Sequence, residues 1–176
     1  MRDKILPATT ILKANLTMPL IKDTKGIVVF AHGSGSSSRN SPRNQYVAQV
    51  LNKGGLTTLL VDLLTLEEEE SDNKIQKISH HHKIPGPVIL NKFNINLLAK
   101  RFVSITDWVL QNPPTQNLIV GYFGASTGTT ASLIAAAAQH SDTIAAIVSR
   151  SGRPDLDGVE SLKLVKSSTS HSRWWQ

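Results

Sequence analysis

Short apolar runs alternate with amphipathic stretches along most of this 176-residue chain. Aliphatic runs bounded by glycine or polar residues are typical of buried strands, and apolar residues three or four positions apart are typical of helices. The runs predict strands over 9–16, 26–31, 56–64, 117–123 and 144–148, and the helical spacing predicts helices over 44–53, 95–112 and 126–139. Strands and helices that alternate at this pace predict an α/β fold with a doubly wound, mostly parallel sheet.

One segment, residues 65–92, breaks the alternation. Four consecutive glutamates (67–70) are followed by a polar stretch, three histidines (80–82) and Pro85-Gly86-Pro87, and neither the strand nor the helix period continues there. This pattern predicts an inserted loop or mobile lid, with the glutamates in a solvated turn or helix start. Consecutive histidines do not easily converge on one ion, and no carboxylate stands at a ligand spacing, so we expect no metal site.

Composition removes several classes of protein. The chain has no cysteine, which excludes disulfides, iron–sulfur clusters, cysteine-ligated zinc and a cysteine nucleophile. Its longest purely apolar run, residues 133–138, is far too short for a membrane span. Charged residues and a proline interrupt the first twenty positions, so no signal-peptide core is seen. We therefore expect a cytoplasmic protein without a membrane partner.

The formal charge of +6 raises the question of nucleic-acid binding. The 19 basic residues are scattered, and the only dense pair, Lys100 and Arg101, is expected in a surface helix. Nucleic-acid-binding proteins usually cluster their basic side chains and interleave aromatic residues, which make up only 5% of this chain. The pattern favours a small-molecule partner over a nucleic acid.

The most informative motif is Gly124-Ala125-Ser126-Thr127-Gly128, between a predicted strand and a predicted helix. A nucleophile on such a tight turn needs strained backbone angles, and glycines two positions either side relieve crowding with the neighbouring strand and helix. The helix N-terminus behind Ser126 favours developing negative charge. The motif alone is weak, and a serine that merely caps the helix is the alternative interpretation.

A second motif, His32-Gly33-Ser34-Gly35, directly follows the predicted strand 26–31. Acyl transfer needs backbone N–H donors that stabilise the oxyanion of the tetrahedral intermediate, and glycines give a loop the freedom to present them. The two motifs lie about 90 residues apart, each at the carboxyl end of a strand, and together they are more specific than either alone.

Five segments carry a family resemblance: VVFAHGSGSSSRNSPRNQYVA, LLVDLLT, FNINLLAKRFVSITDWV, GYFGASTGTTASLIAAA and SRSGRPDL. In these segments the sequence resembles the α/β-hydrolase superfamily, in particular its dienelactone-hydrolase-like group. The resemblance spans roughly residues 26–156. It implies that Ser126 is the nucleophile and that the N–H groups of Ser34 and Thr127 form the oxyanion hole. His32, Gly33, Gly124 and Gly128 would support the turn and the loop, without a cofactor or metal.

The resemblance has one departure that concerns the substrate. Dienelactone hydrolases use a cysteine nucleophile, and this chain has none. A carboxylic ester or a related acyl compound is therefore the expected substrate class, hydrolysed through a serine.

The expected base and acid are harder to find. The family order is serine, then Asp or Glu, then histidine, and Asp155 and His171 are the candidates that follow Ser126. The family also implies two further strands and a final helix, so we expect residues 1–166 to form a hydrolase domain truncated at its C-terminus.

Residues 167–176 show no strand or helix period and look non-native. Codons for 167–175 can be chosen so that the next reading frame encodes an apolar run ending in three glycines. This possibility suggests a frameshifted tail.

Two alternatives to an active serine hydrolase follow from the same residues. The chain would be an inactive remnant or small-molecule binding module if it keeps the pocket without a working base. An anion-binding module that uses the helix N-terminus at Ser126 is the weaker alternative. A phosphate-binding P-loop is excluded, because no lysine lies between Gly121 and Thr130.

Overall fold

The computed structural model describes residues 4–5, 10–20, 24–33, 39–81, 89–140, 142–152, 163, 165 and 168–172. Its strands are β1 (Lys4–Ile5), β2 (Leu12–Thr17), β3 (Gly26–Ala31), β4 (Thr57–Val61), β5 (Ile119–Ala125), β6 (Ile144–Arg150) and β7 (Ser168–Ser172). The helices are α1 (Pro42–Lys53), α2 (Leu66–His81), α3 (Ile95–Gln111) and α4 (Thr127–Ala138), with a 3₁₀ turn, η1 (Asn91–Phe93).

The strands form one sheet in the order β1-β2-β4-β3-β5-β6-β7. Strands β4, β3, β5, β6 and β7 pair in parallel, whereas β2 runs antiparallel to β4 and to the two-residue β1. The predicted mostly parallel α/β sheet is therefore confirmed, and each predicted strand and helix is present with its ends displaced by a few residues at most. Because parallel strands share one carboxyl edge, the segments after β3, β4, β5 and β6 meet there.

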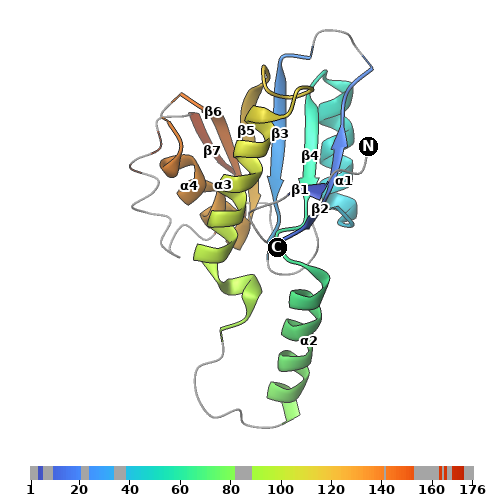
Figure 1. The fold of residues 1–176 in the computed structure, drawn as a ribbon, viewed down its shortest axis with the longest axis vertical. Coiled ribbons are helices and arrows are strands. Elements are labelled where there is room, and N and C mark those ends of the chain that lie inside the picture. The colour runs from blue at the N-terminus through green and yellow to red at the C-terminus, as the bar shows by residue number, and fades with distance from the viewer. Residues whose placement is uncertain are drawn as a thin grey trace.

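Helices cover both faces of the sheet (Figure 1). The larger core contains side chains of α3 and α4 packed on β3, β4 and β5, and it includes Phe102 with its ring edge against Tyr122. The smaller core lies on the face of α1, where Ala48 packs with Phe30 and Leu60. This two-sided burial explains why the central strands are nearly continuous apolar runs.

Local signals set the helix starts. Ser41 caps α1 by accepting a hydrogen bond from the Asn44 N–H at 3.4 Å, and Pro42 occupies the first turn. Asn94 caps α3 in the same way, accepting from the Leu97 N–H at 3.1 Å. No helix among the described residues is long and apolar enough to cross a membrane.

The prediction of a loop over 65–92 is wrong for residues 66–81, which form α2. Thr65 and Glu68 make a reciprocal capping box: the Glu68 N–H donates to Thr65 Oγ1 at 3.3 Å, and the Thr65 N–H donates to Glu68 Oε2 at 2.9 Å. Helix α2 extends away from the sheet (Figure 1), and most of its described side chains are exposed or half-buried. The hydrophobic period was missing because a helix that leaves the core needs no continuous apolar face.

The prediction that the C-terminal tail lacks regular structure is wrong for residues 168–172. They form β7, which pairs in parallel with β6 over the register Ala146↔Ser168 to Arg150↔Ser172. A strand that adds to a sheet edge is held by main-chain hydrogen bonds, which require no alternation of apolar side chains. Residues 82–88 and 173–176 lie outside the described residues.

Candidate active site

Ser126 occupies the turn between β5 and α4 in a conformation that is rare for a residue with a side chain. Its backbone angles are φ 50° and ψ −123°. The Ser126 N–H donates to the carbonyl oxygen of Arg150 at 3.2 Å, and the Ser126 carbonyl accepts from the Thr129 N–H at 3.0 Å. Strain of this kind persists only where surrounding contacts hold the backbone in place, and such strain clusters at functional sites.

The flanking glycines are required by close backbone contacts. A Cβ atom added at Gly124 would lie 2.6 Å from Thr129 Cα. A Cβ atom at Gly128 would overlap the carbonyl oxygens of Ala31 and His32. The first turn of α4 therefore packs directly against the carboxyl end of β3, as expected for a strand–serine–helix turn.

The two predicted motifs meet at this turn. A Cβ atom added at Gly33 would lie 2.9 Å from Ser126 Cβ and 3.0 Å from the Ala125 carbonyl oxygen. The segment after β3 thus touches the serine, although His32 and Ser126 are far apart in the sequence. Ser34 and Gly35 lie outside the described residues.

His32 joins the segments after β3 and β4 through hydrogen bonds of its ring. The residue is 5% exposed, and its Nε2 atom accepts a hydrogen bond from the Leu63 N–H at 2.7 Å. Nδ1 then carries the proton of the neutral ring and donates it to the Gly33 carbonyl oxygen at 2.8 Å. Burial lowers the pKa of His32, against the opposing effects of the Gly33 carbonyl and the Asp62 charge. Both ring nitrogens are occupied, so His32 supports the loop and has no free nitrogen for proton transfer.

Two residues whose backbones lie beside the serine turn each carry a buried side-chain polar atom without a hydrogen-bond partner. Among the described residues, Thr127 Oγ1 and Arg150 Nη1 find no partner, and Thr127 is only 3% exposed. Burial lowers the pKa of the Arg150 guanidinium, and the positive charge of Arg43 lowers it further. Buried polar groups are normally paired, so these two atoms are exceptions to the usual pairing.

The structure leaves the predicted acid and base only partly placed. Asp155 lies outside the described residues. His171 lies on β7, where the register aligns it with Ser149 of β6, and Ser149 aligns with Gly124 of β5. Two strand spacings, about 10 Å, therefore separate the His171 backbone from the strand that leads to Ser126.

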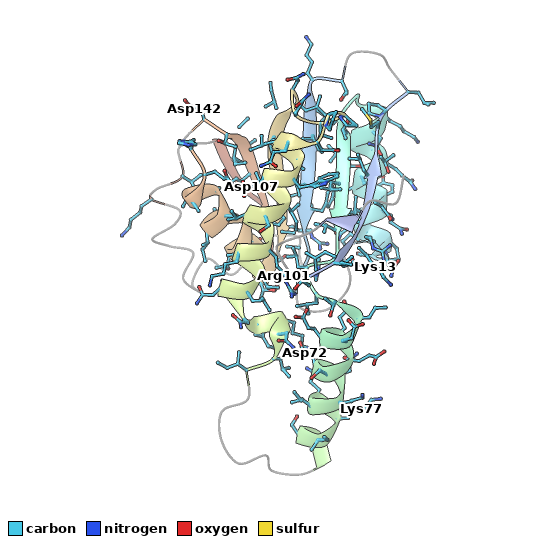
Figure 2. The ribbon with its side chains drawn as sticks, viewed as in Figure 1. Lys13, Asp72, Lys77, Arg101, Asp107 and Asp142 are labelled. Atoms are coloured by element: carbon cyan, nitrogen blue, oxygen red, sulfur yellow. The ribbon has the colours of Figure 1, made fainter. Side chains whose placement is uncertain are left out.

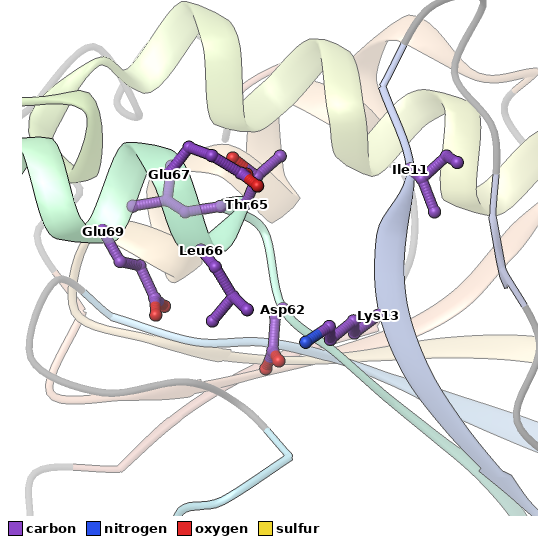
Figure 3. A pocket seen from close by; sticks show the side chains of 8 residues that line it. Ile11, Lys13, Asp62, Thr65, Leu66, Glu67 and Glu69 are labelled. Carbon is purple, nitrogen blue, oxygen red and sulfur yellow. The ribbon is translucent and has the colours of Figure 1, made fainter.

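A cavity of about 110 Å³ opens at the same carboxyl edge, beyond β4. Its lining combines Lys13, Asp62 and Glu69 with apolar side chains such as Leu64, and Lys13 and Asp62 point toward one another there (Figure 3). Burial raises the pKa of Glu69, and the nearby Asp62 charge adds to the increase. Ser126 does not line this cavity, and within the described ranges no three His, Asp or Glu side chains are grouped to hold a metal ion.

The two residues of the Lys100–Arg101 pair, both on α3, differ in exposure. Lys100 is exposed, but Arg101 is 5% exposed and lies where α3 approaches α2 (Figure 2). It binds Glu68 through two hydrogen bonds of 2.6 and 2.8 Å. Asp62, whose Oδ2 pairs with Arg39 Nε at 2.7 Å, was not among the predicted residues. Two features of the sequence could have pointed to these ion pairs: the capping-box position of Glu68, and the single acidic residue, Asp62, within a predicted apolar strand.

Several solved structures have a similar arrangement of strands and helices. A dienelactone hydrolase from Anabaena variabilis is 48% identical, with a TM-score of 0.84 over 98% of this chain and 72% of that protein. An alpha-beta serine hydrolase homologue from Coxiella burnetii (16% identical, TM-score 0.70, 98% and 73% covered) shares the fold. So does a cold-adapted esterase from an Arctic intertidal metagenomic library (13% identical, TM-score 0.66, 100% and 71% covered).

Sheet order, serine turn and structural likeness together define the α/β-hydrolase fold. Given its 48% identity to the Anabaena enzyme, the chain belongs to the dienelactone-hydrolase-like group of that superfamily. No protein-family model matches it. A Mycobacterium tuberculosis H37Rv protein named "Putative phosphoribosyl transferase" is 49% identical over 144 residues, 82% of this chain but 28% of that protein. A protein of the same name from strain CDC 1551 matches equally. The chain thus spans just over a quarter of the length of these curated relatives.

Proposed function

We propose that the protein is a serine hydrolase that cleaves a carboxylic ester or a related acyl compound. Ser126 Oγ attacks the acyl carbonyl carbon, a base accepts the hydroxyl proton, and the alcohol leaves with a proton to give an acyl-serine ester. Water then adds to this ester and releases the acid and the free serine. The observation that carries the proposal is the strained Ser126 turn against Gly33.

The oxyanion hole in this proposal uses main-chain donors on both sides of the turn. The Thr127 N–H lies at the start of α4, where the helix dipole favours negative charge. The second donor is the N–H of Ser34, which directly follows the Gly33 carbonyl in the chain.

His171 and Asp155 are the proposed base and acid of this reaction. His171 is favoured as base because it follows Ser126 in the chain and lies near the carboxyl end of β7, two strands from β5 at the same edge of the parallel sheet. In this superfamily the acid and then the histidine follow the serine along the chain. Asp155 and His171 follow Ser126 in that order. A His171→Gln variant tests the proposed base, since loss of the base lowers turnover without lowering substrate affinity.

The name carried by the mycobacterial relatives points to a different reaction, phosphoribosyl transfer. This chain covers 28% of those proteins, whereas it covers 72% of the dienelactone hydrolase. We propose that the stretch shared with the mycobacterial proteins is a hydrolase-like part, and that the name describes chemistry carried outside it.

Hydrolysis of short p-nitrophenyl esters tests the function. Wild-type protein is expected to release p-nitrophenol at a rate that falls to the buffer background in Ser126→Ala. Ser104→Ala is the matched control, because Ser104 is on α3 and donates only to the Lys100 carbonyl, at 3.2 Å. Equal rates for wild type and Ser126→Ala would refute a serine nucleophile and favour the non-catalytic binding module.

A further inference from the structure

We infer that Glu68 and Arg101 are positioning residues for the serine site, which they reach through a continuous chain of hydrogen bonds that ends at Gly33. The inference rests on the proposed hydrolase function, because Gly33 precedes the proposed oxyanion donor. The residues involved come from four different elements or their ends. They lie at the carboxyl edge of the sheet and are otherwise separate in sequence.

The chain of contacts begins on α2. Glu68 accepts hydrogen bonds from both terminal nitrogens of Arg101, Nη1 at 2.6 Å and Nη2 at 2.8 Å. Burial alone would raise the pKa of Glu68, but the hydrogen bonds from Arg101 and Thr65 outweigh it and lower that pKa. The charged, two-point pair fixes the orientation of the Arg101 guanidinium.

Arg101 transmits that orientation to the segment after β4. Its Nη1 atom also donates to the carbonyl oxygen of Leu63 at 2.7 Å, in a buried contact. Leu63 is fully buried, and its N–H donates to His32 Nε2 at 2.7 Å. Leu63 is therefore held at its carbonyl by α3 and in turn holds the His32 ring.

The last contact reaches the serine turn. His32 Nδ1 donates to the Gly33 carbonyl oxygen at 2.8 Å, and Gly33 packs against Ser126 Cβ. A peptide group is planar, so a contact that fixes the Gly33 carbonyl restricts the whole peptide group that begins there. A shift at Glu68 or Arg101 thus alters the geometry on which transition-state stabilisation depends.

The alternative is that Glu68 and Arg101 only attach α2 to the domain. The chain offers a matched control, because Asp72 lies one turn further along α2 and attaches it by a separate set of bonds. Asp72 accepts from the Asn91 N–H, Asn91 Nδ2 and the Lys92 N–H at 2.9 to 3.0 Å. No bond of this set involves Leu63 or His32.

The test compares wild type, Glu68→Gln, Arg101→Lys and Asp72→Asn in two measurements. The first is amide hydrogen exchange at Leu63, together with the His32 tautomer from nitrogen NMR. The second is the rate at which a fluorophosphonate modifies Ser126. We expect Glu68→Gln and Arg101→Lys to speed exchange at Leu63, reduce the Nδ1-protonated tautomer and slow labelling about tenfold, because small displacements at a reacting group are costly. Asp72→Asn should leave both measurements at wild-type values.

The outcomes separate the inference from the proposed function. Unchanged Leu63 exchange and His32 tautomer in Glu68→Gln and Arg101→Lys would overturn the inference, as would an equal effect of Asp72→Asn. Absence of labelling in the wild type would instead overturn the proposed function. In that case the exchange and tautomer measurements still decide whether the chain of contacts reaches Gly33.

Discussion

The serine turn and helix α2 are held in place by opposite means. At the turn, backbone atoms of β3, β5 and α4 approach so closely that Gly33, Gly124 and Gly128 leave no room for a side chain. Helix α2 packs few apolar side chains and is attached through Glu68 and Asp72, which accept hydrogen bonds from α3 and from the η1 segment. Close backbone packing fixes the Ser126 turn, whereas polar contacts attach an element that extends away from the sheet.

Gly128→Ala, at the serine turn, should cause the largest loss of stability among the variants considered for these two regions. Alanine favours a helix over glycine, but the added Cβ overlaps the Ala31 and His32 carbonyl oxygens, so we expect a loss of about 3 kcal/mol in unfolding free energy. Urea denaturation measures it. Gly121→Ala is the control, because its Cβ meets the nearest atom, the Ala146 carbonyl oxygen, at an ordinary 3.5 Å. Equal losses in the two variants would show that the backbone at the serine turn is no more tightly packed than the backbone around Gly121.

Asp72→Ala tests the polar attachment of α2. The buried carboxylate accepts three hydrogen bonds, and their removal leaves three donors unpaired, at an expected cost of about 2 kcal/mol. Hydrogen exchange should show the loss in α2 and η1 while the amides of β5 keep their protection. The exposed neighbour Asn73 provides the control Asn73→Ala, which should change nothing. Equal loss of protection in β5 would mean that α2 is part of the core.

These two regions also differ in how far the sequence predicts them. The glycine spacing of the Gly124–Gly128 motif predicts a tight turn, because only glycine fits beside the neighbouring strand and helix. The apolar runs around it predict the core strands. A helix start at residues 67–70 was one of two predicted alternatives and is confirmed, but its continuation to His81 was not predicted, because an exposed helix lacks a hydrophobic period. The Thr65–Glu68 capping box was the local signal for this helix. The partnership of Arg101 with Glu68 across 33 positions depends on tertiary packing, which no local spacing reveals.

His32 links the two regions and should make stability depend on pH. Its pKa is lowered on folding from the ordinary 6.5, mainly by burial, so the unfolded chain binds the proton more readily. The contribution of His32 to the free energy of unfolding is therefore fully present above pH 6.5. It is lost as the pH decreases from 6.5 toward the lowered pKa of the folded state. Denaturation of wild type and His32→Gln between pH 7.5 and 5 should show a smaller pH-dependent loss in the variant. Parallel curves would contradict the buried neutral ring.

Arg150→Met should have the smallest effect on stability. The Arg150 Nη1 atom is buried without a partner among the described residues, so methionine keeps the apolar stem and removes an uncompensated donor. We expect a change within about 0.5 kcal/mol in thermal denaturation. Arg39→Met is the contrast, since it leaves Asp62 without its ion pair and should cost about 2 kcal/mol. A loss in Arg150→Met as large as in Arg39→Met would contradict the unpartnered state of Arg150 Nη1.

Mass spectrometry of the fluorophosphonate-treated protein tests the central claim most directly. A nucleophilic serine on the strained turn predicts one covalent adduct, located on the peptide that contains Ser126 and absent from Ser126→Ala. An unmodified Ser126, or a variant labelled as fast as the wild type, would contradict the assignment of this turn as the site of a serine hydrolase.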